Sequence, residues 1–283
     1  MEQFCDLHTH SYYSDGTCSP TQLVEEAERA GLGAVVLCDH NTVAGLPEFL
    51  DAARGRTVEA IPGIEITTEY EGIELHILGL QISHEHYDRI TAMMEDLLIR
   101  KERSEQALIE ALNRDGMGLS YERLKAKTKG GYVNRAHIAV ALVEKGFAPD
   151  FRSAFRMYLN PDKGYYVPPK RFDVFEIITM LKAMGAAVVL AHPFLNLDEA
   201  GLRAFLPKAK ACGLDGMETL YTKYTPETTQ NACRIADEFG ILHSGGSDFH
   251  GSNKPDTNMG TGHGELRVPC AFWEQLRKRA AEE

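Results

Sequence analysis

The sequence lacks the features that mark secreted, membrane and disulfide-rich proteins. Six cysteines occur among its 283 residues, but none belongs to a Cys-x-x-Cys pair and their spacing indicates no disulfide framework. We therefore interpret them as small buried hydrophobic side chains. No apolar run approaches the length of a membrane span, and the first residues lack the basic and apolar regions of a secretory signal. These absences predict a protein of the reducing cytoplasm with no membrane partner.

An excess of positive charge is also missing. The chain has 30 Lys and Arg against 41 Asp and Glu, so its formal net charge is −11. This balance disfavours a general nucleic-acid-binding surface and tight binding to duplex DNA. The Gly-rich stretch GTGHGE near the end has no strand–loop–helix context and does not indicate a P-loop. A hydrophobic fraction of 43% is nevertheless enough for a sizeable core.

Short apolar runs alternate with amphipathic segments over most of the chain. We expect strands in QFCDLH, AVVLCDH, VEAIPGIEITTEY, IELHILGLQI, AAVVLAHP, LDGMETLY and ILHSGG. Helical patterns separate most of these runs, for example SPTQLVEEAERAG, which has Ser19 at the N-cap and Pro20 in the first turn. Such alternation is typical of an α/β protein with a parallel sheet or barrel. The length suits a single barrel of this class.

Residues 84–167 interrupt this alternation. EHYDRITAMMEDLLIRKERSEQALIEALNRDG has the apolar periodicity of one long helix, and NRAHIAVALVEKG and DFRSAFRMYL are also helical. We therefore predict a barrel of residues 1–83 and 168–283 with a helical insertion at 84–167. The insertion has 14 basic and 12 acidic residues, whereas the remainder has 16 and 29. The insertion is thus the part better suited to meet an anion, as a substrate-binding cap.

Histidines and acidic residues gather where the predicted strands end. The nine candidate metal ligands are His8, His10, Asp15, His40, Glu65, His76, His192, Asp248 and His250. Barrel enzymes assemble active sites at strand ends. Each histidine alone is as well explained by chance or packing, but the joint pattern favours metal. Nitrogen and oxygen donors suit Zn, Mn or Fe. Nine donors exceed the four of a closed structural zinc site, which predicts two or three ions and displacement at phosphorus.

The motifs DLHTHSYYSDG, LCDHNT, PGIEI, ELHILG, LAHP and GGSDFHG resemble, in this order, those of the PHP family, the polymerase and histidinol phosphatase phosphoesterases. The resemblance implies a distorted seven-stranded (β/α) barrel with a helical insertion and metals at the strand ends. It implies one ion at His8, His10, Glu65 and Asp248. A second ion would lie at Glu65, His76 and His192, and a third at Asp15, His40 and His250. Some relatives have histidine in place of Asp15. We expect Asp39 to orient a ligand.

The insertion resembles that of the nucleotide phosphatase and 5′-3′ exoribonuclease branch. RKER places Arg100 and Arg103 on one helix face, and NRAHIA contains Arg135 and His137. The resemblance implies that these residues bind a substrate phosphate, for which arginine forks are suited. The alternative is a solvated charged face. Tyr221 either lines the site or caps a strand.

These observations predict a metal-dependent phosphoesterase. Its substrate would be a nucleotide, such as a nucleoside 3′,5′-bisphosphate cleaved at the 3′-phosphate, or 5′-phosphorylated short RNA. We favour Mn over Fe or Zn as the divalent metal. Arg100, Arg103 and Arg135 would hold a non-reacting phosphate, and His192 or His250 would protonate the leaving oxygen. The alternatives are a histidinol-phosphate-type phosphatase and a non-catalytic metal-binding regulatory module.

Overall fold

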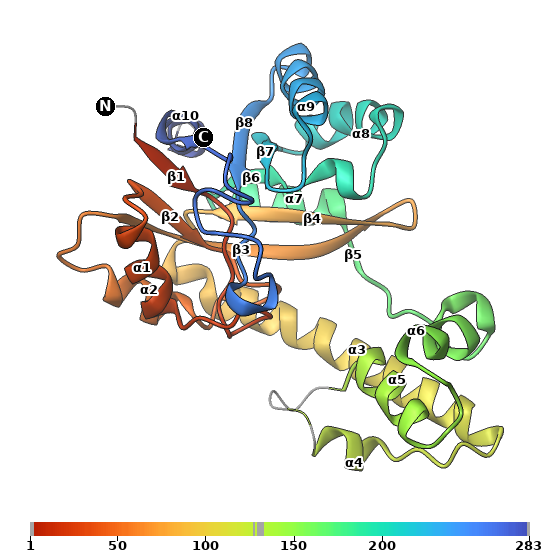
Figure 1. The fold of residues 1–283 in the computed structure, drawn as a ribbon. Coiled ribbons are helices and arrows are strands. Elements are labelled where there is room, and N and C mark those ends of the chain that lie inside the picture. Colours follow the sequence, from red (N-terminus) through yellow and green to blue (C-terminus); the bar gives the residue numbers. More distant parts are fainter. Residues whose placement is uncertain (1–2, 127, 129–132, 282–283) are drawn as a thin grey trace. The chain divides into compact units, whose positions relative to one another are not determined.

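The chain divides into two compact units in a computed structural model that describes residues 3–126, 128 and 133–281. We call Met1–Thr91 with Phe172–Glu283 the barrel unit, and Ala92–Arg171 the insertion unit. Figure 1 shows the two units in a ribbon coloured by position in the sequence. Among the described residues, none of the helices combines the length and the apolar character needed to cross a membrane.

The barrel unit is built on a single sheet. Among the described residues the strands are β1 (Phe4–Asp6), β2 (Ala34–Leu37), β3 (Glu59–Tyr70), β4 (Ile73–Leu80), β5 (Phe172–Asp173), β6 (Ala187–Leu190), β7 (Gly216–Tyr221), β8 (Leu242–Gly246) and β9 (Val268–Pro269). Their order is β8-β7-β6-β4-β3-β2-β1-β9, and β5 pairs with β3. All seven predicted strands occur, and the two-residue strands β5 and β9 are additional.

Strand β4 departs from the parallel pattern that the sequence predicts. It runs antiparallel to both β3 and β6. The cause is the tight turn at Glu71 and Gly72, whose φ angles are 50° and 81°. Two consecutive residues in this left-handed region form the turn that joins hairpin strands. The prediction of parallel neighbours is therefore wrong for β4, although the alternating pattern holds around it.

The two ends of the sheet meet, so that the barrel is nearly closed. Just past the end of β1, the Leu7 amide donates to the Gly245 carbonyl at 3.2 Å. The Asp248 amide donates to the His8 carbonyl at 2.9 Å. Gly246 permits this approach, since a Cβ there would lie 2.3 Å from the His8 Cβ. The predicted distorted α/β barrel is thus confirmed, and its closure joins the two ends of the sequence.

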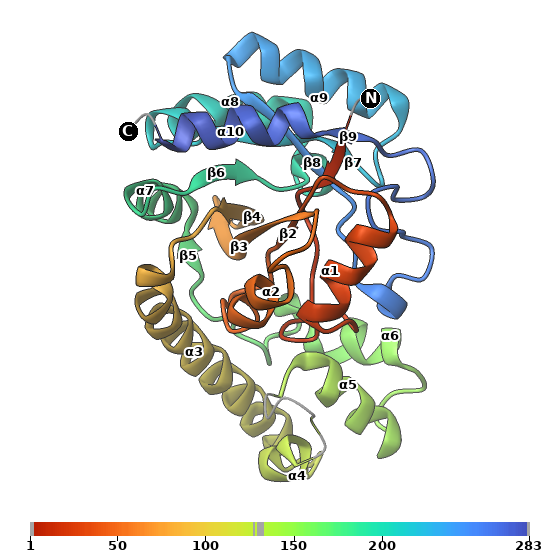
Figure 2. The same cartoon turned by 90° about the vertical axis from the view of Figure 1, so that its left-hand side faces the viewer.

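Helices surround the strands of the barrel unit, as Figure 2 shows. They are α1 (Pro20–Arg29), α2 (Leu46–Ala52), α7 (Val174–Ala183), α8 (Glu199–Ala211), α9 (Pro226–Phe239) and α10 (Cys270–Ala281), with short 3-10 turns at His84–His86, Pro193–Leu195 and Gly251–Asn253. Helix α1 begins at the predicted Ser19 cap, which pairs reciprocally with Gln22. An apolar core of strand side chains is closed by Trp273 and Leu276 of α10.

The insertion unit is helical and has a core of its own. Its helices are α3 (Tyr87–Arg114), which begins in the barrel unit, α4 (Tyr121–Lys125), α5 (Arg135–Glu144) and α6 (Phe151–Ala154), followed by a π-helical turn at Phe155–Leu159 and a 3-10 turn at Pro161–Lys163. The predicted long helix is confirmed as α3. Leu108, Leu112, Ile138 and Leu142 are fully buried in this core, which gives α3 and α5 a shared apolar face.

Candidate metal centre

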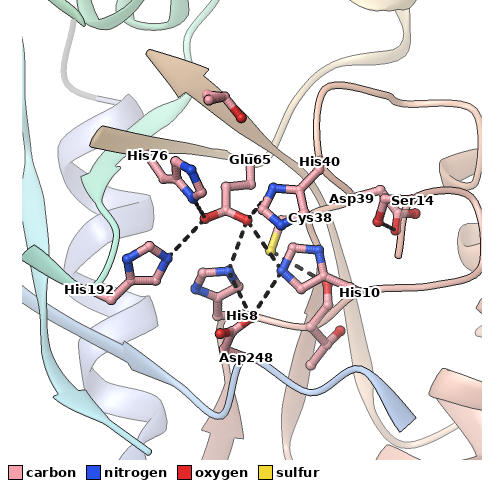
Figure 3. A network of polar contacts seen from close by, with 12 residues as sticks. His8, His10, Ser14, Cys38, Asp39, His40, Glu65, His76, His192 and Asp248 are labelled. Atoms are coloured by element: carbon pink, nitrogen blue, oxygen red, sulfur yellow. Dashed lines mark hydrogen bonds and ion pairs between the residues drawn. The ribbon is translucent and has the colours of Figure 1, made fainter. Parts of the chain in front are cut away.

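Glu65 lies at the middle of a ring of histidines. Its carboxylate is fully buried in β3, and Figure 3 shows the imidazoles directed toward it. Oxygen Oε1 is 2.8 Å from His76 Nδ1 and 3.2 Å from His192 Nε2. Oxygen Oε2 lies near His40 Nδ1 at 2.9 Å, His8 Nε2 at 3.3 Å and His10 Nε2 at 3.3 Å. One carboxylate of β3 therefore connects five histidines from four other segments of the barrel unit.

Asp248 forms a second connection on the other side of His10. Its Oδ1 lies 3.3 Å from both His10 Nε2 and His250 Nδ1. Its Oδ2 accepts hydrogen bonds from the Tyr221 hydroxyl at 2.8 Å and the Lys254 ammonium at 2.6 Å. Tyr221 is buried and so lines the site, which was one of the two alternatives expected from the sequence. The two donors fix Asp248 with one oxygen toward the histidines.

Asp15 completes the cluster on its open side. Its carboxylate lies 3.1 Å from His250 Nε2 and 3.8 Å from His40 Nε2. The Asp15 side chain is 55% exposed, whereas those of His250 and Asp248 are 3% and 9% exposed. The cluster is therefore sealed by the barrel on most sides and meets solvent near Asp15.

The strands explain why these residues meet. His8 and His10 follow β1 at i and i+2, so extended backbone points both to one side. His192 and Asp248 have left-handed backbone, with φ of 28° and 56°. Non-glycine residues in this region are strained, and such strain concentrates at functional sites. The chain thus turns sharply at two of the positions that approach Glu65 and its neighbours.

Several buried atoms of the cluster have no hydrogen-bond partner. Within the described residues these atoms include His8 Nε2, both ring nitrogens of His10, His40 Nδ1 and Glu65 Oε2. A buried polar atom without a partner costs about 1–3 kcal/mol. Five such atoms in one place are therefore unfavourable by themselves. They are compatible with cations, because imidazole nitrogens and carboxylate oxygens are the usual ligands of Mn, Fe and Zn.

The charges of the cluster depend on one another. Burial by itself would raise the pKa of Glu65, but positive charge on His40, His8 and His76 holds that pKa well below its usual value. Burial lowers the pKa of His10 to about 3. His10 is therefore neutral near pH 7, which is the form that can donate a lone pair to a metal.

Comparison with known proteins identifies the family. Residues 6–167 match the model of the PHP domain. A 5′-3′ exoribonuclease of Haemophilus influenzae is 36% identical over 88% of this chain and 91% of its own length. The chain belongs to the PHP family.

Two further PHP comparisons cover nearly the whole chain. A 3′,5′-nucleoside bisphosphate phosphatase of Chromobacterium violaceum is 27% identical over 97% of this chain and 96% of its own. A solved structure from Bifidobacterium adolescentis, described as a candidate metal-dependent phosphoesterase, aligns with a TM-score of 0.74 and 31% identity over 98% and 96% of the two chains. These findings confirm the prediction of a metal-dependent phosphoric ester hydrolase of the PHP family. They do not favour the histidinol-phosphatase or non-catalytic alternatives.

The PHP ligand sets expected from the sequence lie together, with overlaps. Four groups of residues each have ligand atoms within 4.8 Å of one another. They are His10, Asp15, His40 and His250; His8, Glu65 and His192; His40, Glu65 and His76; and His8, His10 and Cys38. The expected third set thus gains His10 as a neighbour. Glu65 pairs with His192 in one group and with His76 in another. Which residues share which ion remains a prediction.

Glu218 is a site residue that the sequence reasoning missed. It is fully buried in β7. Its Oε1 lies 2.8 Å from His8 Nδ1, and its Oε2 accepts the His192 amide at 2.6 Å. These contacts orient His8 Nε2 toward Glu65 and hold the strained backbone at His192. The only available signal was a lone carboxylate inside the apolar run LDGMETLY, since buried glutamates are rare unless paired.

Among the described residues, Asp39 makes its hydrogen bonds to two serines and not directly to a candidate ligand. Its Oδ1 accepts the Ser11 amide at 2.8 Å and the Ser14 hydroxyl at 2.6 Å, and its Oδ2 accepts the Ser11 hydroxyl at 2.6 Å. Asp39 therefore orders the loop between His10 and Asp15. The expected role in orienting a ligand stays a prediction, and it would act through this loop.

Replacing Glu218 with Gln should weaken metal binding by about 10- to 100-fold, the usual cost of losing an outer partner of a ligating histidine. Gln retains one acceptor for the two donors, so either His8 or the His192 backbone loses its partner. Titration of the metal-free protein with Mn²⁺ would measure the change. Glu227→Gln on the exposed face of α9 is the matched control. An unchanged affinity for Glu218→Gln would rule out this positioning role.

The four insertion residues predicted to bind substrate have different surroundings. Arg100 donates to the Lys170 carbonyl at 2.9 Å and pairs with Asp96 at 2.9 Å. Arg103 is exposed on the same helix. His137 Nδ1 accepts the Asn134 amide at 3.1 Å as part of the α5 cap. His137 therefore has a structural role at one nitrogen, and only Nε2 could meet a ligand.

Arg135 has the most organised position of the four. Its guanidinium carbon lies 4.3 Å from the Tyr166 ring centre and 5.8 Å from that of Phe155. Glu105 lies nearby and is buried, and its Oε2 has no hydrogen-bond partner within the described residues. Burial raises the pKa of Glu105 to about 7, although Arg135 opposes this shift. Burial thus reduces the negative charge that Glu105 places beside Arg135.

Proposed function

We propose that this PHP protein hydrolyses phosphate esters of nucleotides that have a second phosphate. The substrate would be a nucleoside 3′,5′-bisphosphate, cleaved at its 3′-phosphate, or short RNA with a 5′-phosphate. The observation that supports a catalytic metal site best is the set of five buried nitrogen and oxygen atoms around Glu65 that face one another but make no hydrogen bond within the described residues. The PHP relatives named as an exoribonuclease and as a bisphosphate phosphatase support the choice of substrate class.

Two or three divalent ions would be held by the nine candidate ligands, with Mn favoured over Fe or Zn. The nine candidate ligands are His8, His10, Asp15, His40, Glu65, His76, His192, Asp248 and His250. When bound, such ions supply an activated water and neutralise negative charge at phosphorus. The mixed nitrogen and oxygen donors suit these metals better than calcium, which prefers oxygen alone.

The protein groups around the reacting phosphate would position it and move a proton. Tyr221 and Lys254 hold Asp248, which leaves its other oxygen toward His10 and His250. His192 and His250 are the candidates for protonating the leaving oxygen. Each has its Nε2 beside a carboxylate, Glu65 at 3.2 Å and Asp15 at 3.1 Å. Since Asp15 is the exposed ligand, a substrate would enter on that side.

A second phosphate would be bound by the insertion unit, through Arg135 with Arg100, Arg103 and His137. The argument is strongest for Arg135, because its guanidinium is held against Tyr166 and so loses little freedom on binding an anion. Arg100 is partly engaged by Asp96. A net charge of −11 for the whole chain favours small or single-stranded substrates over long duplexes.

A direct test compares substrates with the Mn-loaded protein. We expect turnover of adenosine 3′,5′-bisphosphate and of 5′-phosphorylated short RNA, and much slower turnover of histidinol phosphate. Chelation should abolish the activity, and addition of Mn²⁺ should restore it. Absence of turnover of every phosphoester by protein with measured bound metal would refute the enzymatic proposal. Preferred hydrolysis of histidinol phosphate would refute the substrate class.

A further inference from the structure

Two neighbouring tyrosines are exposed beside the candidate centre. Tyr12 and Tyr13 are 50% and 41% exposed. Their ring centres are 4.8 Å apart with 25° between the planes, which is a stacked arrangement. Neither ring belongs to the barrel core, and neither is assigned a role in the metal centre. Contiguous exposed apolar surface of this kind often marks a binding site.

The tyrosine pair lies in the loop that joins two candidate ligands, His10 and Asp15. Tyr12 is two residues after His10, and Tyr13 is two residues before Asp15. Both flanking residues belong to one candidate ligand group. Two residues of extended chain span about 7 Å, so the backbone of the pair stays close to the centre. Asp15 is the exposed member of that group, so the pair belongs to the same exposed loop as the ligand that meets solvent.

The loop that presents the two rings is well ordered by hydrogen bonds. Tyr12 N donates to the Cys18 carbonyl at 2.9 Å, and Tyr13 N donates to the Ser11 hydroxyl at 3.1 Å. Ser11 is in turn held by Asp39. The rings are thus placed before any ligand arrives, which reduces the entropy lost on binding.

The two rings also contact the start of α2. The Tyr12 hydroxyl donates to Glu48 Oε2 at 3.3 Å, while Glu48 Oε1 accepts the Thr21 hydroxyl at 2.8 Å. Tyr13 packs on Gly45, where an added Cβ would lie 3.0 Å from the ring. One ring surface is therefore used against the protein, and the remaining surface faces solvent.

We propose that Tyr12 and Tyr13 form a stacking platform for the nucleobase of the substrate. This inference rests on the proposed function, since it assigns the base of the same nucleotide whose phosphate reaches the metal centre. Every base has a flat π face, and stacking on an aromatic side chain contributes about 1–3 kcal/mol per base. The platform recognises a base without reading its identity. It therefore predicts tolerance of all four bases together with discrimination against substrates that have no base.

The test compares two substrates that differ only in the base: adenosine 3′,5′-bisphosphate and methyl riboside 3,5-bisphosphate. For Tyr12→Ala and Tyr13→Ala we expect kcat/KM for the nucleotide to fall about 10-fold, the effect of losing one stacked base. The value for the methyl riboside should stay unchanged, so the ratio of the two falls. Tyr12→Phe and Tyr13→Phe should retain the ratio, because a phenyl ring still stacks. Ile73→Ala, an exposed apolar residue at the start of β4, is the control.

The possible outcomes separate this inference from the proposed function. Equal losses on both substrates, or no loss on either, would overturn the platform while leaving the phosphoesterase in place. A change of oligomeric state in sedimentation with an unchanged substrate ratio would also overturn it, because the rings would then serve a protein contact. If the unmodified protein turns over neither bisphosphate, the proposed function fails and this inference falls with it.

Discussion

Glu65→Gln is expected to lower kcat/KM of the Mn-loaded protein by at least about 10³-fold, which corresponds to about 4 kcal/mol of transition-state stabilisation. Both oxygens of Glu65 lie between histidine nitrogens. Gln has nearly the same shape, but it replaces one charged oxygen with an NH₂ group that cannot bind a metal. Steady-state kinetics on adenosine 3′,5′-bisphosphate and measurement of bound metal would show the loss.

The matched control for this change is Glu69→Gln. Glu69 lies on the same strand, β3, but is exposed. It should retain activity and metal content. If Glu65→Gln binds metal and turns over substrate as the unmodified protein does, Glu65 does not bridge the ions. The melting temperatures of the two variants would show whether a loss of activity comes from a loss of folding.

Arg135→Ala is expected to lower kcat/KM about 100-fold for a nucleoside 3′,5′-bisphosphate. Charge-assisted hydrogen bonds are worth about 1.5–3 kcal/mol each, and the larger value corresponds to roughly this factor. Adenosine 3′-monophosphate lacks the second phosphate, so its turnover should change less than about 3-fold, the limit for a residue that contacts nothing on this substrate. The difference between the two substrates is the quantity to measure.

Arg114→Ala is the control for the loss of a positive charge, because Arg114 is exposed at the end of α3 in the same unit. Equal losses on the bisphosphate and the monophosphate for Arg135→Ala would show that Arg135 does not hold a remote phosphate. A Glu105→Gln variant gives a further check. It removes the buried carboxyl beside Arg135, whose positive charge acts against the effect of burial on the Glu105 pKa, and it should leave bisphosphate binding intact.

The strand order could be anticipated only in part. The apolar runs identify β2 and β6, both with the sequence AVVL and fully buried, because strands inside a barrel are apolar on both faces. The direction of β4 could not be read from its residues, since it depends on the left-handed turn at Glu71 and Gly72. The boundaries of α3 agree with its apolar periodicity. A long segment with this period can bury its apolar residues together only as a helix.

The candidate site shows a similar division. Strand ends meet at one edge of a barrel, so placing His8, His192 and Asp248 together required only the pattern of motifs. Glu65 lies inside β3 and was placed with them by the resemblance to the PHP motifs. Glu218 could not be found in this way. It lies in the middle of β7, and its importance comes from two hydrogen bonds to residues distant in sequence. The hydrogen bonds of Asp39 to Ser11 and Ser14 could not be read from the motifs either, because they depend on the path of the loop between His10 and Asp15.

Closure of the barrel has a consequence for folding. The Leu7 and Gly245 backbones pair across almost the full length of the chain, and such distant pairings form late because their loop must first be closed. Asp248 and His250 follow that last pairing, whereas the insertion unit has local contacts and a core of its own. A nascent chain still on the ribosome would thus fold its helices while presenting only partial ligand sets. The complete set would exist only after synthesis passes His250 and the first and last strands join.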